Sequence, residues 1–444
     1  MFSETARQLV HISMGVFALL LRALAWWQAA ICALAAVAFN AVVLPRMGGR
    51  TIVRPVDAAR GYPFGILVYP VSVLLLILAF PARLDIAASA WGVLAFGDGA
   101  ATLAGRRWGR HRLPWNPEKT VEGLLAFIVA GGAAAVFLAW WTAPAITPPP
   151  SMAFIVAAPV LAALAAGLVE TVPIALDDNI SVPASAGAVL WLCSLATAAA
   201  WAASRDGLVA NLAPALLVNT AAATGGWLLG TVRVSGMLVG WVIGVAVFAC
   251  LGVEGWALLF LTFCTATVAS RLGLKKKALL GIAEERGGRR GAGNAIANTG
   301  LAAVAALAAA ATPFHEAALV AFVAALATGG SDTVASEIGK AWGGNTDLPT
   351  TLAAVRPGTP GAVSLEGTAA GILGALALAA CGALLGLIPA WTVWAVVAGA
   401  VAGSVVESAL AATLESARIV NNDVLNFVNT ATGALVAVLI VRMS

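Results

Sequence analysis

Two aspartates embedded in apolar sequence each begin a similar series of glycines and acids. The first series is Asp98, Gly105 and Thr120-Val121-Glu122-Gly123, and the second is Asp332, Gly339 and Ser364-Leu365-Glu366-Gly367. A third element follows in each half, namely Glu170 with Asp177-Asp178-Asn179, and Glu407 with Asn421-Asn422-Asp423. Because order and approximate spacing agree, the sequence predicts an internal repeat with one polar site in each copy.

These residue types suit the binding of a nucleoside triphosphate. A carboxylate inside a bilayer costs about 2.5–3.5 kcal/mol on insertion scales, so Asp98 should face the protein interior or an aqueous cavity. Glycines allow backbone N–H groups to approach phosphate, and carboxylates can hold Mg²⁺ that bridges phosphates. A structural role is the alternative for both aspartates. Asp332 follows Gly329-Gly330 and could be the N-cap of a helix.

Basic residues near both series could neutralise phosphoryl charge. Lys119 precedes Glu122 in an arginine-rich loop, and Arg289 and Arg290 precede Asn298 in a second basic loop. Loops of this kind could also serve only to anchor the chain at the membrane surface. The sequence contains neither GxxxxGK[ST] nor the HRD and DFG motifs, so a P-loop enzyme and a protein kinase are excluded.

The elements that must position these residues are membrane helices. Of 444 residues, 61% are hydrophobic and only 10% are charged, against about a quarter charged in soluble domains. Apolar stretches of about 17–25 residues predict α-helices instead of a membrane barrel. Fifteen helices are expected, near 10–25, 27–44, 64–81, 86–105, 121–142, 151–172, 184–203, 208–230, 234–252, 255–271, 293–311, 315–330, 362–387, 391–412 and 426–442.

The distribution of Lys and Arg predicts the orientation of these helices. With the N-terminus in the cytoplasm, all 25 basic residues except Arg22, Arg83, Arg205 and Arg442 fall on the cytoplasmic side. We therefore expect an N-in, C-out protein of a bacterial cytoplasmic membrane, with both sites facing the cytoplasm. The net charge of +4 then reflects topology and not nucleic-acid binding. The five cysteines are isolated in apolar stretches, which argues against disulfides and zinc.

The helix count agrees with two parallel copies of seven helices and one connecting helix, which gives both copies the same orientation. We expect residues 1–204 to form the first copy, 205–233 the connecting helix and 234–444 the second copy.

The first half resembles the membrane phytol kinase and dolichol kinase family. That resemblance rests on Asp98, Ala101, Gly105, Gly109, Pro114, Lys119, Glu122, Gly123 and Ala126, on Arg7 and His11, and on Asp178-Asn179. The second half resembles the phytyl-phosphate kinase family, which shares its membrane domain with uncharacterised proteins. That resemblance rests on Arg289, Arg290, Asn298, Asp332, Glu337, residues 356–368, Asn422, Asp423 and Asn426. Glu407 departs from the pattern, because an aspartate is more common there.

The resemblance implies two consecutive reactions. A prenyl alcohol of the phytol, geranylgeraniol or farnesol class is phosphorylated to the monophosphate and then to the diphosphate, with CTP as donor and Mg²⁺ as cofactor. The residues by themselves do not separate CTP from ATP.

The resemblance also implies roles for individual residues. Catalytic roles are expected for Asp98, Lys119, Glu122, Asp332 and Glu366. Nucleotide or phosphate binding is expected for Gly105, Gly109, Gly123, Asp178, Asn179, Arg289, Arg290, Asn298, Gly339, Arg356, Gly367 and Asn422. The expected Mg²⁺ ligands are Asp98, Glu122, Asp332, Glu337, Glu366 and Asp423. For the two aspartates, metal binding and proton abstraction are both open.

Two other functions fit parts of the sequence. A transporter or flippase for prenyl phosphates would explain the repeat and the intramembrane acids, although the predicted outer side offers few polar groups. A cytidylyltransferase acting on a lipid phosphate would use the same nucleotide site but would release pyrophosphate.

Overall fold

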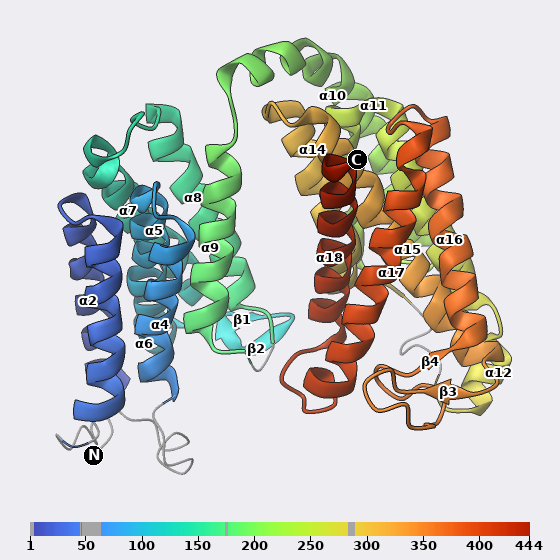
Figure 1. Cartoon of the computed structure of the whole chain (residues 1–444), viewed down its shortest axis with the longest axis horizontal. Helices are drawn as coiled ribbons and strands as arrows, with labels where there is room; N and C mark the ends of the chain where they lie inside the picture. The colour runs from blue at the N-terminus through green and yellow to red at the C-terminus, as the bar shows by residue number, and fades with distance from the viewer. Residues whose placement is uncertain (1–3, 45, 47–63, 174–175, 283–288) are drawn as a thin grey trace. The chain divides into compact units, whose positions relative to one another are not determined.

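The computed structural model describes residues 4–44, 46, 64–173, 176–282 and 289–444. The chain divides into two compact helical units, Met1–Leu195 and Ala196–Ser444 (Figure 1). Eleven helices in the described residues are long and apolar enough to cross a membrane, which confirms the predicted all-α integral membrane class. The expected total of fifteen helices and the N-in, C-out orientation stay predictions.

The first unit is built around a helix that is buried on almost every side. Its elements are α1 Glu4–Met14, η1 Gly15–Arg22, α2 Trp26–Ala38, η2 Phe39–Val43, α4 Phe64–Ala79, α5 Leu84–Gly92, η3 Val93–Asp98, α6 Gly99–Trp108, β1 Arg112–Leu113, β2 Asn116–Thr120, α7 Val121–Thr142, η4 Ala143–Ala145, α8 Met152–Glu170 and α9 Asp178–Ser194. In α5 all residues except Trp91 are buried, and in η3 all except Phe96. A helix that is apolar all round is expected to be central, and this one continues through Asp98 into α6.

The second unit also has a central helix that carries its aspartate. Its elements are α10 Ala198–Leu228, α11 Val234–Arg271, α12 Leu274–Leu279, α13 Ala292–Ala295, η6 Ile296–Gly300, α14 Leu301–Ala311, α15 His315–Trp342, β3 Thr346–Asp347, β4 Val363–Ser364, α16 Leu365–Leu384, η7 Ala390–Thr392, α17 Val393–Leu410, η8 Ala411–Glu415 and α18 Asn422–Met443. The run Phe322–Ser331 of α15 is buried without interruption, and α15 packs against α11, α14, α16, α17 and α18.

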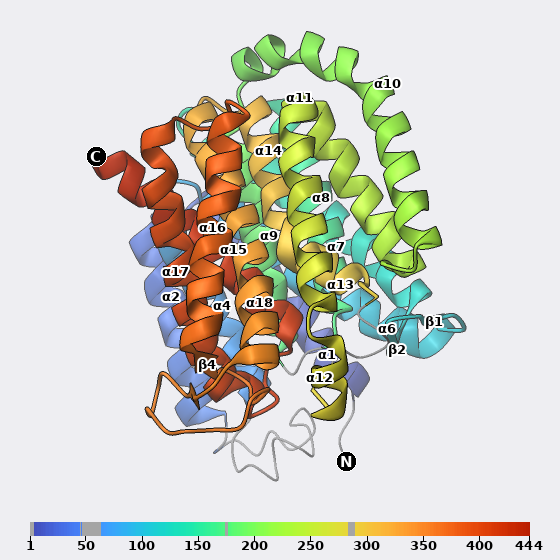
Figure 2. The same ribbon diagram turned by 90° about the vertical axis from the view of Figure 1, so that its right-hand side faces the viewer.

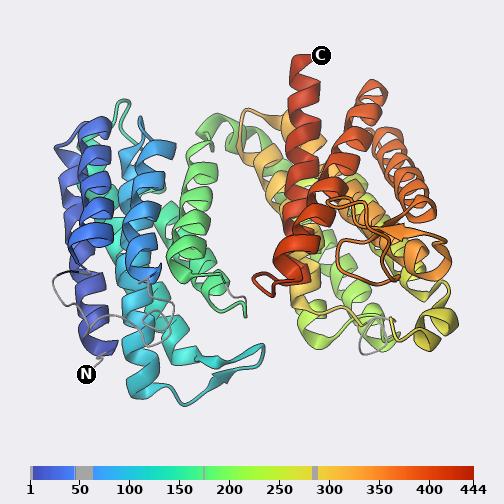
Figure 3. The ribbon, with the colours of Figure 1, turned by 60° about the horizontal axis from the view of Figure 1, so that its bottom comes forward.

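Short hairpins lead into one helix of each unit. Strands β1 and β2 pair antiparallel and run directly into α7, while β3 and β4 pair antiparallel and run into α16. Figure 3 shows the first hairpin, in cyan, extending beyond the end of α6. In the second unit β4, α12 and the adjoining loops lie at the same end of the helices (Figure 2). The polar loops are therefore gathered at one end of each unit.

Asp332 does not cap a helix, so that alternative is wrong. Helix α15 runs without a break from His315 to Trp342 and contains Asp332 in its second half. The preceding glycines serve close packing. A Cβ on Gly329 would lie 3.1 Å from the backbone oxygen of Asn298, and one on Gly330 would lie 3.1 Å from Cγ2 of Thr262.

The predicted boundary between helices near 203 and 208 is also wrong. Helix α10 already begins at Ala198, where Oγ1 of Thr197 accepts the N–H of Ala200 at 3.2 Å. The polar residues that suggested a break lie inside this helix, which packs along α11 (Figure 2). The two helices expected over 234–252 and 255–271 are the two parts of α11, which is interrupted at Gly252 with φ 68°.

Candidate functional site

Three carboxylates converge at one end of the first unit. Asp98 ends η3, Glu170 ends α8 and Asp178 begins α9. One oxygen from each carboxylate lies within 4.8 Å of the other two. Asp98 and Glu170 are buried, and Asp178 is partly exposed. Oxygen ligands gathered in this way suit a hard divalent cation such as Mg²⁺, which binds carboxylates together with phosphate oxygens.

Lys119 of β2 reaches the same group of acids. Its Nζ donates to Oε1 of Glu170 and lies 3.4 Å from Oδ2 of Asp178. Burial lowers the pKa of Lys119, but the carboxylates of Asp178 and Glu170 outweigh this effect, and the net result is a raised pKa. The site therefore contains one ammonium group against three acids, and burial raises the pKa of one of them, Asp178, to about 7. A positively charged ligand would compensate the excess of negative charge.

His11 of α1 lies behind Asp98. Its Nε2 is 3.6 Å from Oδ2 of Asp98 and 3.2 Å from the backbone oxygen of Leu94. The ring of Tyr69 meets the imidazole edge-on at a centroid distance of 4.5 Å, and its hydroxyl accepts the indole N–H of Trp91 at 2.8 Å. These contacts hold the imidazole in a fixed orientation beside the acid.

Gly105, Gly109 and Gly123 lie around Thr120, where α6 crosses α7. A Cβ on Gly105 would lie 3.1 Å from Oγ1 of Thr120, and one on Gly123 would lie 3.1 Å from the backbone oxygen of Ala101. Oγ1 of Thr120 accepts the N–H of Gly123 at 3.1 Å and so caps α7. The glycines allow close packing of this crossing, and their binding of phosphate stays a prediction.

Glu122 and Asn179 were also predicted as site residues of the first unit, but they contact residues other than the three carboxylates. Oε1 of Glu122 lies 2.6 Å from Nδ1 of His111, and the carboxylate also accepts the backbone N–H of His111 at 3.3 Å. Asn179 donates its backbone N–H to Oδ1 of Asp177 at 2.9 Å in the first turn of α9. Among the described residues, neither Glu122 nor Asn179 belongs to the group of three carboxylates.

A polar cavity of about 320 Å³ surrounds Asp332 in the second unit. Its charged and amide lining consists of Arg290, Asn294, Asp332, Glu337, Lys340, Glu407, Glu415, Asn422 and Asn426. The carboxyl groups of Asp332 and Glu407 are in hydrogen-bond contact, and Nδ2 of Asn429 donates to Oε2 of Glu407 at 2.6 Å. Two acids again lie together where the buried part of a central helix gives way to its polar part.

The helix crossing of the first unit recurs beside this cavity. Oγ of Ser364 accepts the N–H of Gly367 at 3.1 Å and caps α16, as Thr120 caps α7. A Cβ on Gly339 would lie 3.1 Å from Oγ of Ser364 and 3.7 Å from Cα of Gly367. The corresponding distances around Gly105 are also 3.1 Å and 3.7 Å. The sequence repeat is therefore a repeat of local structure.

The charges of the two sites differ at corresponding positions. Asp178 and Asn422 are the first residues of α9 and α18, so an amide stands in the second site where the first has a carboxylate. Lys119 directly precedes the capping residue of α7, and the residue in that place before α16 is Val363. The basic residues that line the second cavity are Arg290, which precedes α13, and Lys340 of α15.

Glu337 lines the second cavity but is bound to two lysines. Nζ of Lys277 donates to its Oε2, and Nζ of Lys340 donates to its Oε1 at 3.2 Å. Lys277 is fully buried and also donates to the backbone oxygen of Ser270 at 2.8 Å. The carboxylate of Glu337 is thus already neutralised, and its predicted role as a metal ligand stays a prediction.

Five other predicted residues lie outside the lining of this cavity, within the described part of the chain. They are Arg289, Asn298, Arg356, Glu366 and Asp423. Glu366 and Arg356 are exposed, Asp423 contacts α13, and Arg289 contacts the loop after α10. Asn298 lines a separate, apolar pocket.

Several residues of the two sites were not predicted as site residues, namely the glutamates Glu170 and Glu407, the lysines Lys277 and Lys340, and also His11, Asn294, Glu415 and Asn426. The two glutamates carried a usable signal, because each precedes a similar polar helix start in its half of the sequence. The two lysines carried none, because nothing in the order of residues shows that both face Glu337.

Comparisons with known proteins find a family of membrane proteins and several relatives. The family described as integral membrane protein DUF92 matches residues 217–434. An uncharacterized membrane protein of Synechocystis sp. is 41% identical over 201 residues, which cover 45% of this chain and 78% of that protein. Protein VTE6, chloroplastic, of Arabidopsis thaliana is 36% identical over 213 residues, which cover 46% of this chain and 64% of that protein.

A relative that is named for an activity is also found. The phytol kinase of Synechocystis sp. is 34% identical over 133 residues, which cover 29% of this chain and 55% of that protein. No solved structure matches the chain significantly.

Proposed function

Because the chain belongs to the DUF92 family of integral membrane proteins, we propose that it is a membrane lipid kinase with two consecutive activities. The first unit phosphorylates a prenyl alcohol, and the second unit phosphorylates the resulting prenyl monophosphate. Similarity to a phytol kinase supports a prenyl lipid as substrate. CTP is the proposed donor, and both sites face the cytoplasm of a bacterial cell, where nucleotides are found.

In the first unit Asp98, Glu170 and Asp178 fit a Mg²⁺ ion, because three carboxylate oxygens lie within 4.8 Å of one another. The ion would neutralise charge on the donor phosphates. Lys119 stabilises the negative charge that the transferred phosphoryl group carries in the transition state. The imidazole of His11 accepts the proton of the prenyl hydroxyl as it attacks, and the carboxylate of Asp98 beside it stabilises the imidazolium that forms.

The observation that carries the assignment of the two reactions is the pairing of His11 with Asp98 at 3.6 Å. An alcohol must lose a proton when it attacks phosphorus, whereas a phosphate monoester attacks as an anion and needs no base. No histidine lines the cavity around Asp332 among the described residues. His111 contacts Glu122, and His315 begins α15, seventeen residues or roughly 25 Å before Asp332.

In the second unit Asp332 and Glu407 lie beside the reacting groups, as Asp98 and Glu170 do in the first unit. Arg290 and Lys340 supply positive charge to an acceptor that is itself anionic, and Asn422 avoids the repulsion that a carboxylate would exert there. The charge difference between the sites thus agrees with an alcohol as the first acceptor and its monophosphate as the second.

The test is a reaction of the purified protein in nanodiscs with labelled CTP or ATP, Mg²⁺, and phytol, farnesol, geranylgeraniol or longer polyprenols. We expect the prenyl diphosphate as final product. Asp98→Asn should abolish conversion of the alcohol but still convert supplied monophosphate. Asp332→Asn should accumulate the monophosphate.

Other products would select another function. Incorporation of the nucleotide into the lipid with release of pyrophosphate would identify a cytidylyltransferase. Movement of prenyl phosphate across the membrane without phosphorylation would identify a transporter. If Asp98→Asn kept full activity toward the alcohol, the assignment of the first site would be wrong.

A further inference from the structure

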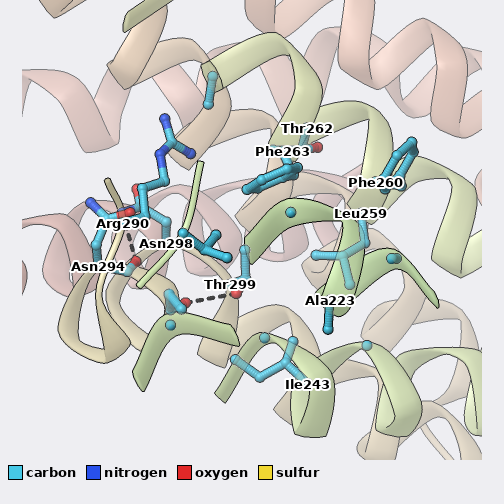
Figure 4. Close-up of a pocket in the computed structure, with 18 of the residues that line it drawn as sticks. Ala223, Ile243, Leu259, Phe260, Thr262, Phe263, Arg290, Asn294, Asn298 and Thr299 are labelled. Atoms are coloured by element: carbon cyan, nitrogen blue, oxygen red, sulfur yellow. Dashed lines mark hydrogen bonds between the residues drawn. The ribbon is translucent and has the colours of Figure 1, made fainter. Parts of the chain in front are cut away.

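An apolar pocket adjoins the polar cavity of the second unit (Figure 4). It has a volume of about 140 Å³ and lies between α10, α11, η6 and the middle of α15. Figure 4 shows Arg290 and Asn294 at one side of this pocket and the apolar side chains of Leu259 and Phe260 at the other. The pocket therefore has a polar end and an apolar end.

The polar end opens at the candidate reaction centre. Arg290, Asn294 and Thr333 line both the apolar pocket and the polar cavity. Thr333 follows Asp332 in α15, so the two spaces meet beside the aspartate. A ligand that occupied both would place a polar head beside Arg290 and an apolar chain against α10 and α11.

From this arrangement we infer that the pocket between α10 and α11 holds the first isoprene units of a prenyl monophosphate, with its phosphate beside Arg290 and Asn294. The inference rests on the proposed function of the second unit. A volume of about 140 Å³ fits only the near end of a long prenyl chain. The rest of the chain extends into the bilayer along the exposed apolar side chains of these helices, such as Leu217 and Val242.

Glycines one turn apart on α11 give this pocket its width. Gly236 packs against the backbone of Arg290 at the polar end, and Gly244 packs against Asn219 further along the helix. Gly240 lies between them, roughly 6 Å along the helix from Gly236. No atom lies within 4 Å of a Cβ on Gly240 among the residues described, so a larger side chain there would enter the pocket without disturbing its neighbours.

A second apolar pocket near Asp332 is the competing place for the chain. It has a volume of about 250 Å³, lies between α15, α16 and α17, and includes Ile372 and Val401. Asp332 is the charged residue that it shares with the polar cavity. A phosphate at this entrance would meet a carboxylate and no basic side chain of the pocket, which disfavours an anionic ligand.

Substitution of Gly240 tests the inference through chain length. Gly240→Phe should lower kcat/KM for farnesyl and geranylgeranyl monophosphate by at least about tenfold. For dimethylallyl monophosphate, whose single isoprene unit should occupy only the polar end of the pocket, we expect a change of less than about threefold. Gly207→Phe on α10 is the matched control, because Gly207 is also exposed with no atom within 4 Å of its Cβ among the described residues. Val401→Phe fills the competing pocket.

The outcomes separate the two pockets. A loss limited to the long substrates in Gly240→Phe, with no change in Gly207→Phe, supports the inference. An equal loss for all three substrates, or a chain-length effect in Val401→Phe alone, overturns it.

A labelling experiment tests the pocket independently of turnover. Farnesyl monophosphate with a diazirine on its first isoprene unit is bound to the intact protein, irradiated, and mapped by mass spectrometry. Displaceable labelling of α10, α11 or η6 supports the inference, and labelling of α16 or α17 or labelling that unlabelled farnesyl monophosphate does not displace overturns it. Labelling of the expected helices without any phosphorylation would refute the proposed function alone.

Discussion

Nε2 of His11 lies 3.6 Å from Oδ2 of Asp98, and both side chains are buried in the first unit. The contact joins α1 to the end of the central helix segment η3. An imidazole is the side chain best suited to transfer a proton near neutral pH. Its position beside Asp98 gives the first site a group that is not found in the lining of the second cavity among the described residues.

His11→Ala should therefore lower phosphorylation of the prenyl alcohol by about 10²–10⁴-fold, the usual contribution of a general base. Conversion of supplied prenyl monophosphate should stay unchanged, because that acceptor needs no base. Both rates are measured with labelled nucleotide and separation of the lipid products. His315→Ala is the control, and equal loss of both reactions in His11→Ala would contradict a role specific to the alcohol.

Lys119→Met should lower alcohol phosphorylation by about 10²–10³-fold, as expected for the loss of one group that stabilises the transition state. The pKa of Lys119 is raised, mainly because the carboxylates of Asp178 and Glu170 outweigh its burial. A pKa above the ordinary value of lysine keeps the ammonium protonated at both pH 6.5 and pH 8.5. The substitution should therefore lower the rate by the same factor at about pH 6.5 and about pH 8.5. A loss that disappeared at the higher pH would show that Lys119 had already lost its proton there.

The sequence predicted the helical membrane fold and the repeated aspartates for physical reasons that act locally. Long apolar stretches must form helices in lipid because backbone groups need partners. Asp98 and Asp332 stand out because a carboxylate is costly in such a stretch. The boundary errors have equally local causes, since Ser204, Arg205 and Asp206 resemble a break but lie within α10.

The set of metal ligands was harder to predict, because an acid can be repeated in both halves of the sequence for a structural reason as well as for a catalytic one. Glu122 and Glu366 occupy the same position in the first turns of α7 and α16. An acid at that position stabilises the helix through a favourable interaction with the helix dipole. Glu170 recurs in the same way but meets Asp98 and Asp178 in space. Which of these acids converge depends on helix packing between distant segments, and a single sequence does not contain that information.

Glu122 and Glu170 can be separated by matched substitutions. Glu170→Gln should lower alcohol phosphorylation by at least about 10²-fold and raise the Mg²⁺ concentration needed for half-maximal rate, because it removes a carboxylate from the group of three. Glu122→Gln should change the rate by less than about threefold, because its carboxylate contacts the exposed His111 and not the other acids. Rates are measured over a range of Mg²⁺ concentrations. The reverse order of effects would restore Glu122 as the metal ligand.

Lys277→Met should destabilise the second unit by at most about 3–5 kcal/mol, the cost of leaving a buried charge with no partner at all. Lys277 and Glu337 are both buried, and Lys340 alone would remain to pair with the carboxylate. Thermal unfolding in detergent measures the change. The double variant Lys277→Met, Glu337→Gln should recover part of the lost stability, and additive effects of the two substitutions would show that the pair contributes nothing.

Asn422→Asp gives the second site the carboxylate that the first site has at Asp178. The new charge would face the cavity that contains Asp332 and Glu407, and it would repel an anionic acceptor. We expect the KM for prenyl monophosphate to rise about tenfold at low ionic strength and less at high salt, because screening weakens repulsion. Alcohol phosphorylation by the first unit should not change.

The control for this substitution is Asn345→Asp, which makes the same change of charge at an exposed position outside the lining of the cavity. It should leave the KM unaltered at either salt concentration. If Asn422→Asp also left the KM unaltered, the negatively charged acceptor would not bind close to this end of α18. The charge difference between Asp178 and Asn422 would then no longer support the order of the two reactions.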